Sequence, residues 1–372
     1  MFFFSFFIRY KMGMPSLTTI LSVVFLAYMA NNMWGIAKLY IPPSCASTDK
    51  QCLTSSISPT SELTFITFST TKSRPSLGKD LKYLDSFDVK VEESSSLIAD
   101  LKLPKTVLNN GTLYLCIFSV PKLKNVDKSK PNWWESVISN PETSYTLTRL
   151  TQHSIPQAET FNLLGEEKEK AKTDHADRSI PVNHLRSKIV LSVMTDQVSM
   201  SPKQVPGELA HVMSLNRDAK KYLPILFIDE LTMRMKDLKI INATDKISKV
   251  EILYQPISFG KLRLFLQFSA ALGSMHSMGF TDKDTDEVKG IFADTNLVLL
   301  LVTFGVSAVH LLFDFLAFKN DVNFWRSRDT VEGLSRKTIL WRAFSQSIIF
   351  LYLIDEETSL LVLIPGRHYF IN

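Results

Sequence analysis

Apolar residues are concentrated in runs near the two ends of the chain, and the long stretch between them has no comparable run. Residues 17–37 (LTTILSVVFLAYMANNMWGIA) carry no formal charge and would extend about 30 Å as a helix, the thickness of one bilayer core. Residues 295–318 give the strongest membrane signal. A third run, 338–354, contains Arg342, which can extend toward a membrane interface. The pattern predicts a multi-pass α-helical membrane protein with transmembrane helices over these three ranges.

The stretch between the first two runs, residues 38–294, predicts a large β-rich domain. Alternating positions with β-branched and aromatic residues indicate half-buried strands at 62–70, 112–120, 188–195 and 249–256. Several short strands of this kind favour a β-sandwich-like architecture. Residues 261–280 are apolar on one helical face and predict a helix, whereas the charged residues 165–181 predict a loop.

The distribution of Lys and Arg predicts the topology. Arg9 and Lys11 precede the first run, and the segment 319–337 carries a further five Lys and Arg residues. Cytosolic segments accumulate these cations. We therefore expect residues 1–16 to be a cytosolic N-terminus, 319–337 a cytosolic loop and 38–294 a luminal domain. The first run has two interpretations, a retained signal anchor or a cleaved signal peptide, and its length favours retention.

Glycosylation sequons and cysteines agree with a luminal domain. Asn110 and Asn242 each begin an Asn-X-Thr sequon, the acceptor of N-linked glycans in the secretory pathway. Cys45 and Cys52 have a spacing that a small loop disulfide can close, which would leave Cys116 over. The alternative is three unpaired thiols.

The sequence shows few features of soluble enzymes or nucleic-acid-binding proteins. The chain contains no P-loop, no GxSxG or HExxH motif and no dinucleotide fingerprint. Its net charge of +5 is spread without a long Lys/Arg block, which argues against nucleic-acid binding. The acidic segment 282–293 resembles a calcium loop, but Glu287 replaces the required glycine and Ala293 the bidentate glutamate. We therefore predict no metal, no cofactor and no enzymatic activity.

His310 and Asp314 are the ionisable pair of the second membrane run. They lie four residues apart and share one face of a helix. Ionisable groups inside a membrane usually face protein or a watery cavity, so one interpretation of the pair is a polar path for lipid headgroups. The competing interpretation places Asp314 near the cytosolic end, with its carboxylate in the interface or paired to Lys319.

Five strings together carry a resemblance to a known family: NNGTLYLCIF at 109–118, YLPILFIDEL at 222–231, GFTDKDTDEVKGIFADTNL at 279–297, HLLFDFLAFKNDVNFW at 310–325 and DEETSLLVLIP at 355–365. Their combination resembles the cleft lip and palate transmembrane protein family, in its 1-like branch, over about residues 15–365. The resemblance implies a multi-pass protein of the endoplasmic reticulum membrane with a large luminal domain.

The resemblance also implies a function. The 1-like branch is known as a phospholipid scramblase that moves glucosaminyl-phosphatidylinositol from the cytosolic to the luminal leaflet during GPI-anchor biosynthesis, without a nucleotide. In that context His310, Asp314, Asp355 and Glu356 are candidates for the lipid path. The sister branch is similar to trafficking or assembly factors that retain client membrane proteins in the endoplasmic reticulum, which is the alternative function.

The C-terminal end departs from the family pattern. Family members continue through several more spans after the stretch that matches SLLVLIP, and this chain has Gly366–Asn372 there. We therefore expect residues 355–372 to be a truncated remainder of the membrane domain. Whether the chain is a fragment or a functional product stays open.

Overall fold

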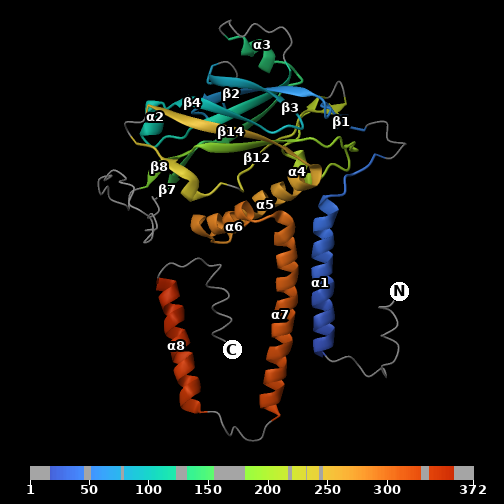
Figure 1. The fold of residues 1–372 in the computed structure, drawn as a ribbon, viewed down its shortest axis with the longest axis vertical. Coiled ribbons are helices and arrows are strands. Elements are labelled where there is room, and N and C mark those ends of the chain that lie inside the picture. Colours follow the sequence, from blue (N-terminus) through green and yellow to red (C-terminus); the bar gives the residue numbers. More distant parts are fainter. Residues whose placement is uncertain are drawn as a thin grey trace. The chain divides into compact units, whose positions relative to one another are not determined.

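The computed structural model describes most of the chain and divides it into two compact units. The described residues are 17–45, 52–76, 79–122, 132–154, 181–216, 220–231, 233–242, 246–327 and 335–355. The helical unit comprises residues 1–39 and 294–372, and the β-rich unit comprises residues 40–293. Figure 1 shows the strands in the β-rich unit and the long helices α1, α7 and α8 in the helical unit. The prediction of a large β-rich region is confirmed.

One four-stranded sheet of the β-rich unit is antiparallel throughout. Its order is β3 (Lys82–Lys90), β2 (Glu62–Thr70), β5 (Tyr114–Pro121) and β6 (Ser144–Arg149). The central strands β2 and β5 are buried along nearly their whole length, which explains why their sequences are almost continuously apolar or β-branched. The strands expected at 62–70 and 112–120 are confirmed.

A second four-stranded sheet is mixed. Its order is β12 (Leu226–Ile228), β9 (Lys188–Met194), β14 (Ile247–Ile257) and β4 (Ser95–Lys102). Strand β14 pairs antiparallel with β4 and parallel with β9. The expected strands at 188–195 and 249–256 are confirmed, and the last strand of the unit in sequence occupies a central position in its sheet.

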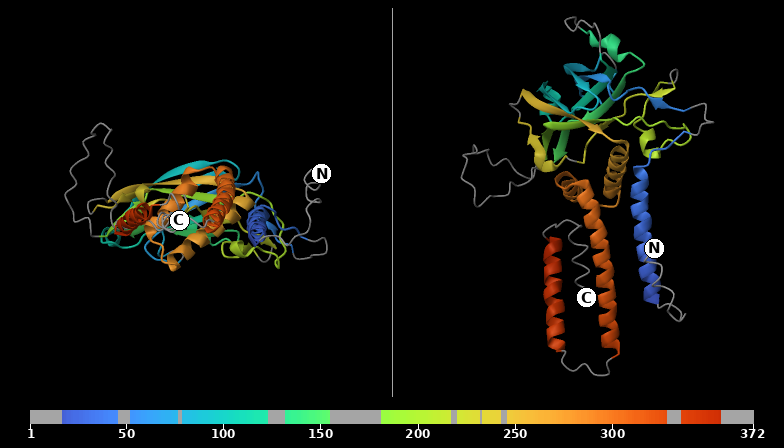
Figure 2. Two further views of the ribbon diagram at one scale, coloured as in Figure 1. Left: turned by 90° about the horizontal axis from the view of Figure 1, so that it is seen from below. Right: turned by 45° about the vertical axis from the view of Figure 1, so that its right-hand side comes forward.

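The main core of the β-rich unit takes side chains from both four-stranded sheets. Phe65 and Ile117 of the first sheet and Leu191, Ile252 and Tyr254 of the second belong to one buried cluster. The rings of Phe65 and Tyr254 lie 5.5 Å apart between centroids, and the Tyr254 hydroxyl is satisfied by a backbone carbonyl oxygen at 2.6 Å. The two sheets therefore share one apolar interior, and the strands that carry it cross in the right-hand view of Figure 2.

The short helix α3 (Trp134–Ile138) covers the other face of the first sheet. Trp134 packs edge-on against Phe68, with ring centroids 4.9 Å apart, and Phe118 contacts Phe68 in the same manner at 5.5 Å. This aromatic cluster buries the outer face of β2 and β5.

Helix α5 (Phe259–Ser277) confirms the helix expected at 261–280, and its first turns pack on a third cluster of buried residues. The helix begins where the Phe259 N–H donates to Asp196 Oδ2 at 2.7 Å. Gly260 is required at this point, because a Cβ there would lie 2.3 Å from Tyr40 Cδ1. The close contact fixes residue 40, the start of the β-rich unit, against α5.

Helix α6 (Asp282–Asp294) forms over the acidic segment that was compared with a calcium loop in the sequence. Its N-terminus is a capping box: the Thr281 N–H donates to Asp284 Oδ2 at 2.8 Å, and the Asp284 N–H donates to Thr281 Oγ1 at 3.3 Å. Asp284 is buried as a result. The carboxylates of this segment therefore serve helix formation.

The remaining elements of the β-rich unit are short. Strands β7 (Thr151–Ser154), β8 (Val182–Arg186) and β13 (Leu238–Ile240) form an antiparallel sheet in the order β13-β8-β7. The others are β1 (Thr54–Ser55), β10 (Leu215–Asn216), β11 (Lys221–Tyr222), α2 (Lys105–Leu108), α4 (Gly207–Ala210) and the 3-10 helix η1 (Met235–Asp237). The predicted loop 165–181 lies outside the described residues apart from Pro181.

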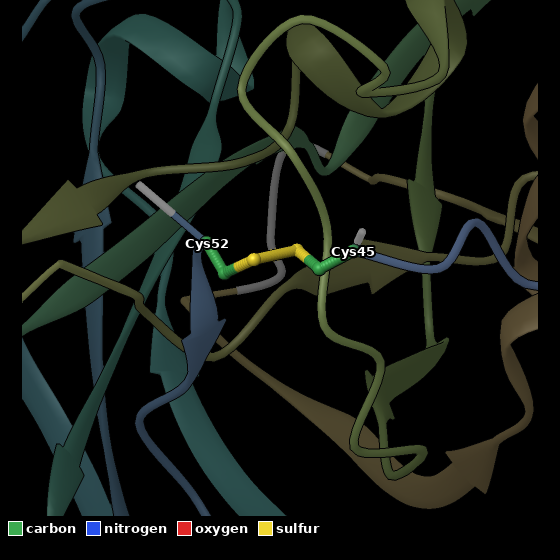
Figure 3. Close-up of a disulfide and its surroundings, with 2 residues drawn as sticks. All are labelled: Cys45 and Cys52. Atoms are coloured by element: carbon green, nitrogen blue, oxygen red, sulfur yellow. A yellow bond between two sulfur atoms is a disulfide. The ribbon is translucent and has the colours of Figure 1, made fainter. Parts of the chain in front are cut away.

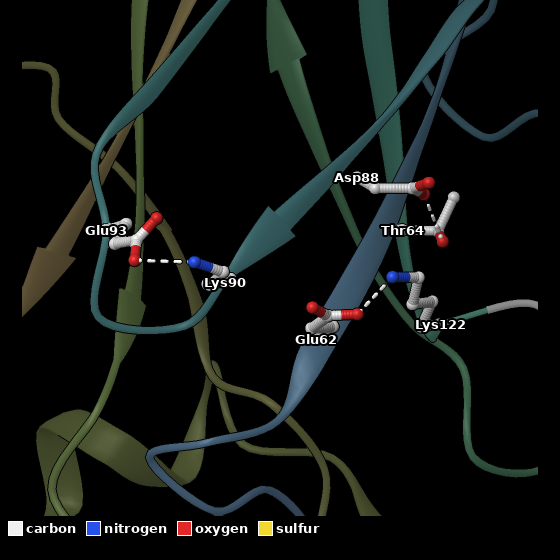
Figure 4. A network of polar contacts seen from close by, with 6 residues as sticks. All are labelled: Glu62, Thr64, Asp88, Lys90, Glu93 and Lys122. Carbon is white, nitrogen blue, oxygen red and sulfur yellow. Dashed lines mark hydrogen bonds and ion pairs between the residues drawn. The ribbon is translucent and has the colours of Figure 1, made fainter.

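Polar side chains connect neighbouring strands at one end of the first sheet (Figure 4). The Thr64 hydroxyl donates to Asp88 across β2 and β3 at 2.6 Å, and Lys122 forms an ion pair with Glu62. The Glu62 carboxylate raises the pKa of Lys122 by this hydrogen bond. Because Lys122 and Glu62 are both largely solvated, we regard the pair as setting strand register more than stability.

The helical unit contains α1 (Leu17–Leu39), α7 (Leu297–Arg326) and α8 (Arg336–Asp355). Two of these are long and apolar enough to cross a membrane, over Thr19–Leu39 and Val298–Phe324. Among the described residues α8 does not reach that threshold, although it is helical over the predicted range 338–354. Residues 1–16, 328–334 and 356–372 of the predicted cytosolic and C-terminal segments lie outside the described residues.

Candidate functional site

Helix α7 is the element that carries the ionisable pair predicted from the sequence, and it is longer than expected. It continues eight residues past the predicted end at 318, because residues 319–326 contain no Gly or Pro to end it. At its start the Asn296 side chain accepts the Val298 N–H at 2.9 Å. Thirty residues of helix extend about 45 Å, more than the roughly 30 Å of a bilayer core.

Most of the α7 surface is apolar and exposed. Large exposed side chains occur all along it: Val298, Leu299, Val302, Phe304, Val306, Val309, Leu311, Phe313, Phe315 and Phe318. A row of this length is far larger than an ordinary exposed apolar patch of a water-soluble domain. Lipid is the solvent that such a helix surface fits.

One face of α7 is polar. Thr303, Ser307, His310, Asp314 and Asp321 follow one another at spacings of four, three, four and seven residues, which places all five on a single narrow face at 3.6 residues per turn. All five are exposed. We call these residues the α7 polar stripe.

The stripe contains both membrane residues singled out from the sequence and three that the sequence analysis missed. His310 and Asp314 lie one helical turn apart, as the spacing predicted. Thr303, Ser307 and Asp321 were missed, although extending the same spacing in both directions would have found them. The Thr303 hydroxyl donates to the Leu299 carbonyl oxygen at 2.8 Å, so its hydrogen is used within the helix and its oxygen can still accept.

The acidic candidates near the C-terminus are not brought to the stripe by any described contact. Asp355 is the last residue of α8, a separate helix, and Glu356 lies outside the described residues. Both stay predictions.

The two sequon asparagines occupy exposed positions of the β-rich unit. Asn110 has a positive φ of 63° in the turn that precedes β5. The turn is held by Asn183, whose amide donates to the Gly111 and Val107 carbonyl oxygens at 2.8 and 3.1 Å. Asn242 follows β13, and the rest of its sequon lies outside the described residues. Both asparagine side chains are accessible to a modifying enzyme in the folded unit.

The three cysteines fall into a pair and a buried thiol. Cys45 and Cys52 form a disulfide with Cα atoms 6.2 Å apart (Figure 3). Cys116 lies in β5 and is buried, and burial raises the pKa of its thiol to about 12. A thiol of this kind is chemically inert at neutral pH, since the thiolate is the reactive form.

In the described part of the chain, no group of three or more His, Cys, Asp and Glu side chains could hold a metal ion. The acidic segment tested as a calcium loop is instead helix α6, as described above. The arrangement that stands out chemically in the helical unit is thus the α7 polar stripe, on a helix that is otherwise apolar over residues 298–318.

Comparisons with known proteins agree with the resemblance seen in the sequence. The pattern of the family described as cleft lip and palate transmembrane protein 1 matches residues 18–367. A zebrafish (Danio rerio) protein named "Lipid scramblase CLPTM1L" is 35% identical over 94% of this chain and 65% of its own length. The human protein of the same name is 36% identical over 95% of this chain and 65% of its own length.

A more distant zebrafish relative, named "Putative lipid scramblase CLPTM1", is 28% identical over 71% of this chain and 43% of its own length. The chain thus spans 65% of the length of the more similar curated relatives. No solved structure matches it with significance.

Proposed function

Because the chain belongs to the cleft lip and palate transmembrane protein 1 family, we propose that it moves phospholipids between the two leaflets of a membrane. The observation that carries this proposal is the α7 polar stripe, a row of polar side chains on a helix whose other residues between 298 and 318 are apolar. The names of its relatives support the same activity.

The stripe suits the physical problem of lipid translocation. A phospholipid crosses slowly because its polar headgroup must enter hydrocarbon, where an unpaired polar group is costly. Hydroxyl, imidazole and carboxylate groups along one helix face can hold water and headgroup together, while the acyl tails stay in lipid beside the apolar face. Such transport lowers a barrier without forming or breaking a covalent bond. The proposed activity is therefore not enzymatic and uses no cofactor.

Within the stripe, His310 and Asp314 are proposed to contact the headgroup. For glucosaminyl-phosphatidylinositol, the lipid that we propose as substrate, the Asp314 carboxylate can pair with the amino group of the sugar. The His310 imidazole can donate a hydrogen bond to the phosphate. One helical turn separates the two side chains, so a single headgroup can reach both.

The finer setting is proposed with the function. We propose that the protein is multi-pass in the endoplasmic reticulum membrane and acts in GPI-anchor biosynthesis, with the β-rich unit on the luminal side as a glycosylated, sandwich-like domain. The Cys45–Cys52 disulfide and the exposed Asn110 and Asn242 support a luminal location. Residues 1–16 and the segment after α7 are proposed to be cytosolic, as their Lys and Arg content favours.

The test is reconstitution of the chain in liposomes that contain labelled glucosaminyl-phosphatidylinositol. We expect exchange between leaflets above the rate of protein-free vesicles, and slower exchange with His310→Ala and Asp314→Asn at equal protein incorporation. Phe315→Leu is the matched control, because Phe315 is an exposed α7 residue away from the stripe. Exchange at the protein-free rate would refute the activity for this chain. Equal rates for wild type and both stripe variants would refute the role of the stripe.

A further inference from the structure

A polar cavity of about 350 Å³ lies within the β-rich unit, at the sheet β13-β8-β7. Its walls come from the end of β6, from β7, from the end of β8, from residues 233–235 and 238, and from one face of helix α6. Residues 282, 285, 286 and 289 of α6 recur at helical spacing and therefore face the cavity together. A cavity of this size is in the range that small ligands occupy.

The cavity is rich in cationic side chains. Arg149, Arg186, Arg234 and Lys289 line it, against the two carboxylates of Asp282 and Asp286, an excess of two positive charges among the lining residues. These cations come from β6, β8, the segment before η1 and α6, so the fold gathers them from positions far apart in sequence. Such convergence on one cavity favours an anionic ligand.

Arg186 is a largely buried cation of the cavity, and two of its nitrogen atoms lack a hydrogen bond to any described residue. Its side chain is 12% exposed, and within the described residues its Nε and Nη1 atoms have no hydrogen-bond partner. Its Nη1 atom forms an ion pair with Glu230 Oε1 at 3.5 Å, on a Glu230 side chain that is 54% exposed. A buried guanidinium with free donors is costly, and a phosphate oxygen is an acceptor that its planar geometry suits.

The Asp286 carboxylate has structural partners that reduce its repulsion of an anion. Asp286 accepts the Met235 N–H at 2.8 Å and thereby joins α6 to the opposite wall. The nearby Lys289 offsets part of its charge. Gln152 adds a neutral polar group of the kind that binds sugar or polyol hydroxyls.

We propose that this cavity binds the phosphate of a small phosphorylated polyol, either free in solution or as a lipid headgroup. Arg186 and Lys289 would hold the phosphate oxygens, with Arg149 and Arg234 at the sides of the cavity. The site lies in the β-rich unit, apart from the α7 polar stripe in the helical unit. It therefore goes beyond the proposed function, and binding can be measured whether or not lipid exchange occurs.

The test measures binding to the purified full chain in detergent by titration calorimetry, at constant ionic strength. The probes are inorganic phosphate, glycerophosphoinositol and the neutral polyol myo-inositol. We expect saturable binding of the two phosphorylated probes and none of myo-inositol. Tighter binding of glycerophosphoinositol than of phosphate would support the proposal. Equal binding of the two would show that the polyol adds nothing and would overturn the polyol part of the assignment. No saturable binding of either phosphorylated probe would overturn the whole proposal.

Three charge variants locate the binding to the cavity. Arg186→Gln and Lys289→Gln are each expected to weaken binding about tenfold or more, as loss of a charge-assisted contact does. Lys239→Gln is the matched control, because Lys239 is an exposed residue of β13 that does not line the cavity. Because Arg186 is buried and its variant could unfold, the thermal transition of each variant is measured in parallel. Unchanged binding in a folded Lys289→Gln variant would refute the assignment.

Discussion

Cys116 lies in the central strand β5, with its thiol among the aromatic side chains that α3 covers. Burial raises the pKa of this thiol to about 12, whereas the other two cysteines are joined in the disulfide. Packing in the fold therefore sets the reactivity of Cys116, whereas the sequence showed only that a third cysteine is present. A single unpaired cysteine in a secretory protein usually suggests a reactive thiol, but Cys116 is part of the core.

We therefore predict that iodoacetamide leaves the native chain unlabelled at pH 8 in the absence of reductant. In denaturant without reductant, one label per chain is expected, on Cys116 alone, and mass spectrometry of the peptides checks both results. Cys116→Ser is the control and should take up no label in denaturant. Rapid labelling of the native chain would show that the thiol is accessible.

Asp286 is a second residue whose properties depend on packing. Burial raises the pKa of its carboxyl above the ordinary value, opposed by the hydrogen bond from the Met235 N–H. The folded state thus holds the proton more tightly than the unfolded chain does. Its contribution to stability is complete below the ordinary aspartate pKa near 4 and is lost as pH rises through the raised value.

For Asp286→Asn we predict a smaller decline in stability over that pH range than in wild type. The asparagine oxygen can still accept the Met235 N–H, so the fold is retained. Thermal unfolding of the purified chain at a series of pH values above 4 measures the difference. Asp282→Asn, another acidic residue of the cavity, serves for comparison, and identical pH profiles for wild type and Asp286→Asn would contradict the prediction.

At the scale of elements, the sequence predicted those strands and helices whose hydrophobic pattern lies within a single segment. The strands β2, β5, β9 and β14 and the helix α5 were found because their alternation or helical spacing lies within one segment. The pairing of β14 between β4 and β9 was not predicted, since its partners lie more than fifty residues away. The strands of two or three residues were missed because they exist only through their neighbours.

Helix α6 shows how a sequence signal can be present and misread. Thr281 and Asp284 have capping-box spacing, but the segment was compared only with a calcium loop, which it does not fit, and no helix was predicted there. The alternate carboxylates of a calcium loop and the acidic first turn of a helix look alike in sequence. Hydrogen bonding in the fold separates them.

We predict that Thr281→Ala destabilises the β-rich unit by about 1 kcal/mol, the usual effect of removing a side-chain cap. The loss of the Thr281 hydroxyl leaves the Asp284 N–H unpaired at the start of α6. Denaturant unfolding of the chain in detergent measures the change. Lys283→Ala, at an exposed position of the same helix, should alter stability by less than half as much, and equal effects would argue against the cap.

At the scale of the whole molecule, composition along the chain predicted a β-rich region between long apolar helices. The unit boundaries at residues 39/40 and 293/294 lie close to the ends of the apolar runs. The cationic cavity could not be predicted in the same way, because its four cations come from residues 149, 186, 234 and 289, which are far apart in the sequence. The α7 polar stripe is an intermediate case. His310 and Asp314 were predicted from the sequence, and the other three residues of the stripe were recognised only when the full length of the helix was known.

If the β-rich unit is luminal, the chain should carry N-linked glycans that increase its mass. Chain expressed in a eukaryotic cell should shift to higher mobility on digestion with an N-glycosidase, because Asn110 and Asn242 are exposed in the folded unit. Asn110→Gln and Asn242→Gln should each remove one step of that shift, and the double variant should show none. A chain without glycans in such cells would place the β-rich unit on the cytosolic side.

The central position of β14 also determines when the β-rich unit can fold. Strands β4 and β9 are synthesised long before residues 247–257. Each has an unpaired edge until β14 has been made and pairs between them. During biosynthesis the nascent chain therefore carries two open strand edges until almost the whole unit has been made. Unpaired strand edges favour aggregation, and this sheet cannot be completed until residues 247–257 have been made.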